Sequence, residues 1–345
     1  RIWAERSQPD HGVESVPKGT IIGMQTAVTS PKPRASIVAR RHTINGLLFT
    51  SPAIVGIALL TLYPLAASLY YSFCSYSALK PPVWVGIGNY RLIWRDLTHR
   101  GLLFESIYNT VYYSVFAVPL GIVAAFLLAL LLNQKVRGQA FFRTLFYVPS
   151  VVPVVASSVL WLWLLNPQHG LVNLMARWTG IEALLSAMGV KTPIGWLADP
   201  AWSKPALILM SVWGVGNSMV IFLAGLQGVP EEYYEAAELD GATSWQKTVA
   251  ITAPMMSPYI LFMLIMGLIG SFQYFTQAWV MTNGTGGPAN STMMYPMYLF
   301  QNAFQFFKMG YACAMAWLLF VAIVAATAII FRTSARYVYY GGDGR

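Results

Sequence analysis

Six stretches of this sequence are long and apolar enough to cross a membrane as helices. A helix needs about 20 such residues to span a hydrocarbon core of roughly 30 Å, and backbone polar groups in lipid must be satisfied internally. The stretches are 44–74, 106–132, 143–165, 205–227, 257–282 and 309–331. Kinks are expected at the prolines inside them, which are Pro52, Pro64, Pro119, Pro149 and Pro153. The sequence therefore predicts an all-α integral membrane protein with about six transmembrane helices.

The composition excludes a soluble globular domain. Only 10% of the 345 residues are charged and 56% are hydrophobic, whereas soluble domains carry roughly 25% charged residues. Two cysteines, Cys74 and Cys313, give no argument for a disulfide framework or a cysteine metal site. The net charge of +9 comes from basic residues that mostly flank the apolar stretches. Membrane orientation explains that charge, and no nucleic-acid partner is expected.

The distribution of basic residues predicts the orientation in the membrane. Fourteen of the 22 lysines and arginines lie in the two tails and in the loops 133–143 and 228–256. Only eight lie in the loops 75–105, 166–204 and 283–308. The positive-inside rule therefore predicts cytoplasmic termini and places the last three loops outside.

This orientation divides the chain into three regions. We expect a flexible cytoplasmic tail over 1–42, a six-helix membrane domain over 43–335 and a cytoplasmic tail over 336–345. Within the external loop 166–204, two amphipathic pieces predict short helices at 171–178 and 181–188.

The spans are notable for the groups they lack. Between their end residues they contain essentially no Asp, Glu, Lys, Arg or His, and Glu105 lies at the edge of the second span. Ion-coupled carriers and voltage sensors usually need such groups near mid-membrane. The sequence also has no phosphate loop, no nucleophile elbow and no paired metal-ligand spacing. We therefore expect no catalytic residue and no metal site, with any energy source outside the membrane.

An acidic loop precedes the fifth span and predicts a helix-turn-helix elbow. Five of the 13 acidic residues fall within ten positions, namely Glu231, Glu232, Glu235, Glu238 and Asp240. Pro230 suits the first turn of a helix that runs to about Asp240, and Gly241 suits a left-handed turn. Ser244 is then expected to cap a second short helix, which carries Trp245, Val249 and Ile251.

The small side chains of this loop favour contact with another protein. Ala236 and Ala237 leave a flat surface on the first helix, while Glu235 and Asp240 are available to basic or amide groups of a partner. The alternative is a solvated acidic loop without a partner.

This loop resembles a motif of a known transporter family. Glu235-Ala-Ala-x-x-Asp240-Gly-Ala242, followed by Trp245, Ile251 and Pro254, is similar to the "EAA" loop of binding-protein-dependent ABC importer permeases. Its Asp-Gly-Ala form resembles the carbohydrate-uptake branch, which includes maltose, glycerol-3-phosphate and lactose importers. The likeness covers roughly residues 44–335 and includes Ser51-Pro52, Tyr63-Pro64, Gly86-Ile-Gly-Asn-Tyr90 and Thr285-Gly-Gly-Pro-Ala-Asn-Ser-Thr292. Residues 1–40 lie outside it, and 283–288 depart slightly from the common pattern.

The resemblance implies the type I ABC importer transmembrane fold in a bacterial or archaeal cytoplasmic (inner) membrane. The loop 228–256 would form coupling helices that insert into a groove of a cytoplasmic ATPase. The implied ATPase-coupling residues are Glu235, Ala236, Ala237, Asp240, Gly241, Ala242 and Pro254. Besides membrane lipid, the implied partners are a second permease, two ATPases that bind ATP and Mg²⁺, and an extracytoplasmic sugar-binding protein. This chain itself would bind no cofactor.

A neutral, hydroxyl-rich ligand that crosses uncharged spans needs amides, hydroxyls and aromatic faces. Trp213 and Asn217 are four residues apart, as are Gln273 and Gln277, so each pair is expected to share a helix face. Ser211, Tyr274 and Asn109 are expected to join them. The resemblance supports Ser211, Trp213 and Asn217, because such permeases contact sugar partly through the span before the coupling loop. Alternatively, these side chains only hold helices together.

Three other functions remain open at this point. A phosphorylated polyol such as glycerol-3-phosphate would favour Arg or Lys along its path, although a partner subunit could supply them. A self-contained channel or facilitator fits the missing ion-coupling residues but leaves the acidic elbow unexplained. An intramembrane enzyme would need catalytic or metal-binding groups that the spans lack.

Overall fold

The computed structural model describes residues 37–134, 137–334 and 338. The expected tails 1–42 and 336–345 lie almost entirely outside these residues. The chain divides into two compact units, 1–61 and 62–345. Within the described part of the first unit, α1 (Ile37–Ile57) leads into a π-helical turn, η1 (Ala58–Leu62), at the unit boundary.

The second unit is built almost entirely from helices. In chain order its elements are α2 (Tyr63–Ser72), β1 (Cys74–Ser77), β2 (Lys80–Trp84), α3 (Gly88–Thr98), α4 (Leu102–Leu132), α5 (Gln139–Val151), α6 (Val154–Leu164), α7 (Leu171–Trp178), α8 (Ile181–Ala187), α9 (Pro200–Trp213), α10 (Gly216–Leu226), α11 (Glu231–Leu239), α12 (Ser244–Lys247), η2 (Thr248–Thr252), α13 (Ala253–Met255), α14 (Ser257–Phe272), α15 (Thr276–Met281), α16 (Tyr295–Phe300), η3 (Gln301–Gln305) and α17 (Met309–Ser334). Segments η2 and η3 are π-helical, as η1 is.

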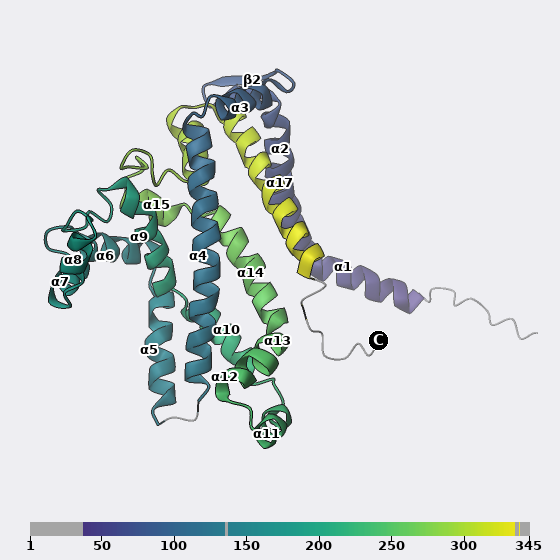
Figure 1. Ribbon diagram of the computed structural model, residues 1–345. Helices are drawn as coiled ribbons and strands as arrows, with labels where there is room; N and C mark the ends of the chain where they lie inside the picture. Colours follow the sequence, from purple (N-terminus) through teal and green to yellow (C-terminus); the bar gives the residue numbers. More distant parts are fainter. Residues whose placement is uncertain (1–36, 135–136, 335–337, 339–345) are drawn as a thin grey trace, which may run out of the picture. The chain divides into compact units, whose positions relative to one another are not determined.

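Helix α4 is the central element of the second unit. It packs against α9, α10 and α14, and it runs from the end that carries α3 and β2 towards the end that carries α11 (Figure 1). Its 31 residues correspond to about 46 Å of helix. Pro119 lies inside it without ending the helix.

The residues that the structure describes include three unbroken helical segments that are long and apolar enough to cross a membrane. They are His42–Ser72, Leu102–Leu132 and Met309–Ser334. They match the expected spans 44–74, 106–132 and 309–331, apart from a few residues at the ends.

The other three candidates are pairs of helices with a bend between them. The bend is 98° between α5 and α6, 47° between α9 and α10, and 66° between Ser244–Met255 and α14. If each pair counts as one span, the described residues contain six candidates. Pro153 explains the sharpest bend, because it forces Val152 into an extended conformation (ψ 129°).

The expected span 257–282 is wrong at its C-terminal end. Helix α14 stops at Phe272, because the amides of Gln273 and Tyr274 bond to Gly270 and Ser271 in tight i to i+3 turns. A separate helix, α15, follows. On the other side, the helical pair extends back to Ser244, well before residue 257.

A small antiparallel sheet, β1 with β2, adds to the expected all-α architecture. Asn89 of α3 supports it, because its buried Nδ2 donates to the carbonyls of Ser72 (2.8 Å) and Cys74 (2.9 Å). Gly310, near the start of α17, packs directly on the Cys74 carbonyl. The sheet is therefore fastened to α2, α3 and α17.

The two helices expected in the loop 166–204 are present as α7 and α8. Asn173 of α7 donates to the carbonyls of Pro167 (3.1 Å) and Ile194 (2.9 Å) and accepts from the Trp196 indole (2.9 Å). The Asn173 side chain thus joins the first part of this loop to its last part.

Replacing Gly310 by alanine should destabilise the second unit. The added Cβ would collide with the Cys74 carbonyl, which is backbone and cannot rotate away. Overpacking of this kind costs about 1–3 kcal/mol. We expect a lower Tm for the detergent-solubilised protein, measured by tryptophan fluorescence. Gly56→Ala is the control, because a Cβ there meets nothing within 4 Å. Equal Tm values for both variants would contradict this packing.

Candidate functional site

The acidic elbow predicted between the fourth and fifth spans is present. Helix α11 starts directly after Pro230, with Glu231 and Glu232 in its first turn, where carboxylates suit the positive end of the helix dipole. Gly241 follows the helix with a φ of +77°, which confirms the expected left-handed turn. The amide of Gly241 bonds to the Glu238 carbonyl (3.0 Å) and that of Ala242 to the Ala237 carbonyl (2.9 Å). This pair of bonds is a Schellman motif, which satisfies the last carbonyls of the helix.

The second helix is capped by Thr243, so the expectation of Ser244 as the cap is wrong by one residue. The Thr243 amide donates to Gln246 Oε1 (2.8 Å), and the Gln246 amide donates to Thr243 Oγ1 (3.4 Å). This capping box requires a Glu or Gln three residues after the cap, and Gln246 stands in that position only for Thr243. Beyond α12 the helix continues through η2 and α13 towards α14.

Two side-chain bonds fold the elbow onto itself. Lys247 Nζ lies 2.6 Å from Glu238 Oε1, and the hydroxyls of Tyr234 and Thr252 are 2.9 Å apart. The hydrogen bond from Lys247, helped by its charge, lowers the pKa of the Glu238 carboxyl. The Glu238 side chain is 64% exposed, so solvent screens this pair and it stabilises the elbow only weakly.

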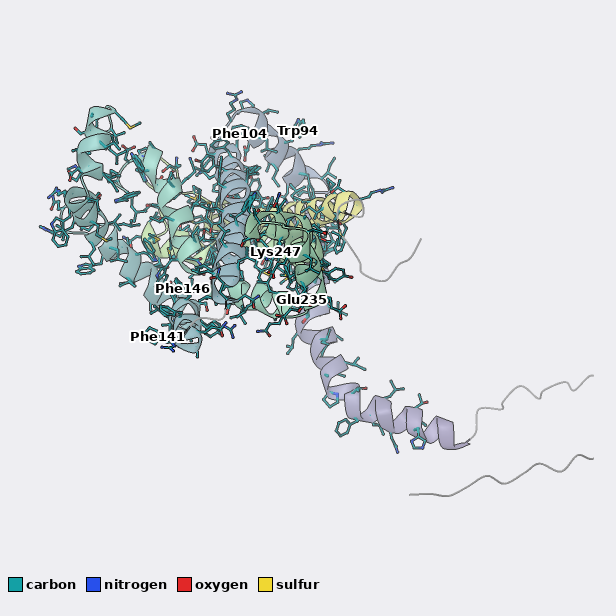
Figure 2. All side chains as sticks on the ribbon, turned by 60° about the horizontal axis from the view of Figure 1, so that its bottom comes forward. Trp94, Phe104, Phe141, Phe146, Glu235 and Lys247 are labelled. Atoms are coloured by element: carbon teal, nitrogen blue, oxygen red, sulfur yellow. The ribbon has the colours of Figure 1, made fainter. Side chains whose placement is uncertain are left out.

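The elbow exposes apolar side chains among its carboxylates. Leu239 is 91% exposed and Trp245 is 73% exposed. Exposed apolar patches are typical of protein contact surfaces, so these two side chains make the elbow a candidate for such a surface. Figure 2 labels Glu235 and Lys247, which lie on the side that comes forward in that view. Leu239 was missed by the sequence analysis, although a leucine in the last turn of an acidic helix was an available signal.

The predicted coupling residues gather on this elbow. Among them, Glu235, Ala236, Asp240, Gly241 and Pro254 are exposed, whereas Ala237 and Ala242 are half-buried. Their role stays a prediction.

A cavity of about 390 Å³ lies among α4, α5, α6, α9, α10, α14 and α15. It collects most of the predicted ligand contacts, which are Ser211, Trp213, Asn217, Gln277 and Tyr274. In the described residues the lining has no charged side chain and no histidine. The polar side chains of the lining are therefore hydroxyls, amides and the indole of Trp213, and they stand among aromatic and aliphatic side chains.

Each of two residue pairs, Trp213 with Asn217 and Gln273 with Gln277, was expected to share a helix face. This expectation is wrong. Trp213 ends α9 and Asn217 belongs to α10, so a bend and not a continuous turn brings both to the cavity. Gln273 follows the end of α14, while Gln277 belongs to α15. Gln273 is consequently exposed and does not line the cavity.

Asn109 does not line the cavity either. Its buried Nδ2 donates to the carbonyls of Asn290 (2.8 Å) and Met293 (3.1 Å), and its Oδ1 accepts from Lys204 Nζ (3.2 Å). Both N–H groups of the Asn109 amide are thus used, and these bonds hold the loop 287–293 against α4. Asn109 is a structural residue in this conformation.

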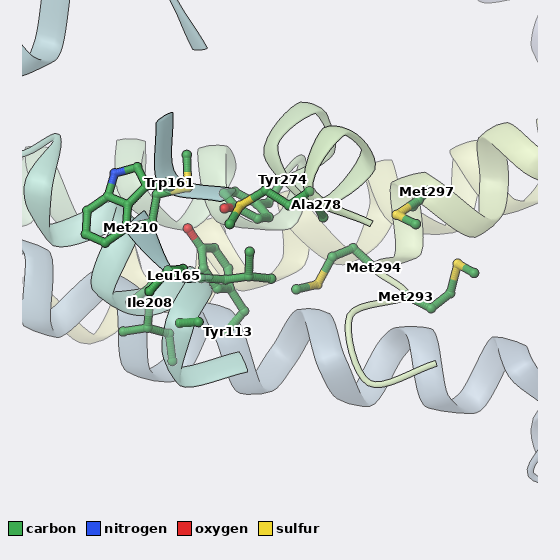
Figure 3. Packing of buried hydrophobic residues seen from close by; sticks show 14 residues of the cluster. Tyr113, Trp161, Leu165, Ile208, Met210, Tyr274, Ala278, Met293, Met294 and Met297 are labelled. Carbon is green, nitrogen blue, oxygen red and sulfur yellow. The ribbon is translucent and has the colours of Figure 1, made fainter. Parts of the chain in front are cut away.

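Hydroxyl groups meet on one wall of the cavity. The rings of Tyr113 and Tyr274 lie 4.2 Å apart, and their hydroxyls point towards the same region (Figure 3). The Tyr274 hydroxyl is buried and has no partner of good hydrogen-bond geometry among the described residues. On the other wall, Ser150 Oγ donates to Asn217 Oδ1 (3.4 Å). The sequence analysis missed Tyr113 and Ser150, because polar residues inside spans are common and no motif distinguishes these two.

Comparison with known proteins identifies what the chain is similar to. Residues 117–339 match the family described as "Binding-protein-dependent transport system inner membrane component". The chain is 39% identical over 302 residues to the probable ABC transporter permease protein YesP of Bacillus subtilis, covering 87% of this chain and 94% of that protein. It is 34% identical over 299 residues to the lactose transport system permease protein LacF of Rhizobium radiobacter, covering 86% and 96%.

The fold is also found in a solved structure. A chain in the crystal structure of a bacterial ABC transporter involved in the import of the acidic polysaccharide alginate matches with a TM-score of 0.69. The match covers 88% of this chain and 100% of that one at 21% identity, so it supports the fold alone.

Removing the charge of Lys247 should return the pKa of Glu238 towards its ordinary value. The folded pKa is the lower one, so the pair stabilises the elbow above the ordinary glutamate pKa, and this stabilisation is lost as the pH falls through the lowered pKa. A ¹³C-carboxyl NMR titration of Glu238 measures the shift in Lys247→Gln. Lys247→Arg is the control and should keep the pKa low. Identical titrations of wild type and Lys247→Gln would show that the contact does not persist in solution.

Proposed function

The chain belongs to the inner membrane components of binding-protein-dependent transport systems, and from this membership we propose that it forms half of the translocation pathway of an ATP-driven sugar importer. It is a non-catalytic membrane component of that system. The observation that carries the proposal is the exposed elbow at 231–255, joined to an uncharged cavity among the helices. Relatives such as LacF support a sugar as the substrate.

The proposed orientation places the elbow and both termini in the cytoplasm, with six spans in the type I importer arrangement. The count of basic residues supports it. So does the position of α11, which lies at the opposite end of α4 from α3 and β2 (Figure 1). The membrane is then the cytoplasmic membrane of a bacterium or archaeon.

The elbow is suited to transmit motion because it is continuous with two cavity walls. Helix α10, which carries Asn217, leads into it. Helix α13 leads from it into α14, which lines the cavity with Gly267 and Ser271. One of two cytoplasmic ATPases, which bind ATP and Mg²⁺, would dock here and the other on the second permease, and together they would switch the pathway between two global states. This chain binds no cofactor in the proposed mechanism.

The cavity favours a neutral sugar over a phosphorylated polyol. No lysine or arginine among the described residues lines it, whereas a phosphate group would need such a partner. Stacking on Trp213 and hydrogen bonds to Asn217, Gln277 and Ser211 suit a sugar. A second permease would complete the pathway, and an extracytoplasmic binding protein would deliver the substrate.

Purification of the tagged chain tests the coupling role. Glu235→Lys reverses a charge of the elbow, and Gly241→Pro forbids a φ of +77°. We expect an ATPase and a second permease to co-purify with the wild type from detergent-solubilised membranes. In the double variant the ATPase should fall at least about tenfold, as when a hot spot is lost, while the second permease remains. Mass spectrometry measures both partners.

Glu182→Lys makes the same charge change on the external helix α8 and should leave the ATPase bound. A chain that purifies alone in all three forms would contradict the proposal and favour a self-contained channel or facilitator.

The two glutamines provide a matched test of the substrate site. Gln277 lines the cavity and Gln273 does not. The assay is uptake by the reconstituted transporter of whichever neutral sugar most stimulates its ATP hydrolysis. Gln277→Leu should raise the half-saturating sugar concentration about twofold to tenfold, the equivalent of one neutral hydrogen bond. Gln273→Leu should leave it unchanged. Equal effects of the two substitutions would count against this cavity as the path.

A further inference from the structure

A second cavity, of about 470 Å³, lies at the opposite end of the second unit from the elbow. Its walls come from β1 and β2, from α3, and from the segment that joins η3 to α17. Figure 1 shows α3, β2 and the start of α17 together at this end. Three basic side chains line the cavity, namely Lys80, Arg95 and Lys308, and all three residues are exposed.

The charges in this cavity are unbalanced. Asp96 is the acidic residue of the lining, and its Oδ2 accepts a hydrogen bond from the Tyr311 hydroxyl (2.8 Å). In the part of the chain that the structure describes, ion pairs join Arg177 to Glu182 and Lys247 to Glu238 but involve none of the three basic residues. Like charges gathered in one cavity repel each other and attract a counter-ion. The cavity therefore selects for an anion.

The position of these basic residues is unusual for a membrane protein. Lysine and arginine are normally depleted outside the membrane. Yet three of the eight basic residues in the predicted external loops line this one cavity. A specific ligand accounts for such clustering better than the general charge bias does.

The cavity adjoins the ends of two candidate spans, where a membrane would meet water. Residues 75–77 follow the candidate span His42–Ser72 within a few positions, and Lys308 immediately precedes the span Met309–Ser334. Large apolar side chains stand exposed close by in sequence, among them Trp94 at 70% (Figure 2) and Trp84 at 59%. Exposed tryptophans are typical of the interface, at the depth of the lipid headgroups.

We propose that this cavity binds the phosphodiester headgroup of an anionic phospholipid of the phosphatidylglycerol type. Arg95 has the planar fork that binds two phosphate oxygens, and Lys80 and Lys308 supply further positive charge. The Asp96 carboxylate retains acceptor capacity beyond its bond to Tyr311. It can accept from a headgroup hydroxyl, which explains a carboxylate in a basic cavity. The assignment to the outer leaflet rests on the proposed orientation.

Lipid retention by the isolated full-length chain tests this site. The protein is reconstituted in vesicles of phosphatidylglycerol and phosphatidylcholine at equal amounts, extracted in mild detergent and analysed by native mass spectrometry. The wild type should retain phosphatidylglycerol in preference to phosphatidylcholine. Arg95→Gln with Lys308→Gln should reduce that retention at least about tenfold, because two charged hydrogen-bond donors are lost.

Two further variants test whether the loss of lipid retention comes from the charge at the site. They distinguish it from an effect of total charge and from misfolding. Arg100→Gln with Lys191→Gln removes the same charge from external residues that do not line the cavity, and it should retain the lipid. Arg95→Lys with Lys308→Arg keeps both charges in place and should also retain it. Because no ATPase or sugar takes part, the result is independent of the importer role.

Three outcomes would overturn the proposal. Equal phosphatidylglycerol retention by the wild type and Arg95→Gln with Lys308→Gln would remove these residues from any lipid site. Displacement of the lipid by millimolar inorganic phosphate would identify a site for a free anion. Loss of an acidic external partner protein from Arg95→Gln with Lys308→Gln, at unchanged lipid retention, would assign the cavity to protein docking.

Discussion

Backbone groups that leave a helix inside a membrane must be buried in protein or face a polar cavity. This constraint explains where the central cavity lies. Val152 stands at the break between α5 and α6, Gly214 at the break between α9 and α10, and Tyr274 at the break between α14 and α15, and all three line the cavity. The broken helices and the cavity are therefore one feature. The interruptions place polar backbone groups along an uncharged path. There water can hydrate these groups, away from lipid.

The elbow depends on the same architecture. In the proposed importer, tight contacts at two glycines of α10 would carry the motion of the elbow to the cavity, because close-packed interiors transmit displacement. An added Cβ on Gly216 would lie 2.7 Å from the Phe146 carbonyl, and one on Gly225 would lie 2.8 Å from Met256 Cε. The first contact joins α10 to α5 and the second joins α10 to the start of α14. The helix that leads into the elbow is thus in tight contact with two walls of the cavity.

The sequence predicts these features unevenly, for physical reasons. Hydropathy locates the spans because it measures the cost of burying side chains in lipid. The turn at Gly241 is predictable because a left-handed conformation favours glycine. Hydropathy does not detect a backbone break among apolar residues. Pro153 indicates one break in the sequence, but the breaks at Gly214 and at Gln273 contain no proline. The four-residue spacing of Gln273 and Gln277 therefore wrongly placed both on one helix face. Asn109 was misread because an amide in a span looks the same whether it binds a ligand or a carbonyl.

Among the described residues, charged clusters lie at both ends of the second unit but not in the cavity lining between them, and this arrangement fits a passive component. Carboxylates gather at the elbow, basic residues gather at the opposite cavity, and the lining between them is uncharged. An uncharged lining holds no group that must be neutralised when the pathway opens to either side, so it sets no electrostatic barrier between the two states for a neutral solute. In the proposed importer, the energy of the cycle must then enter at an end of the molecule. The exposed Leu239 and Trp245 favour the elbow as the surface through which a partner protein would deliver that energy.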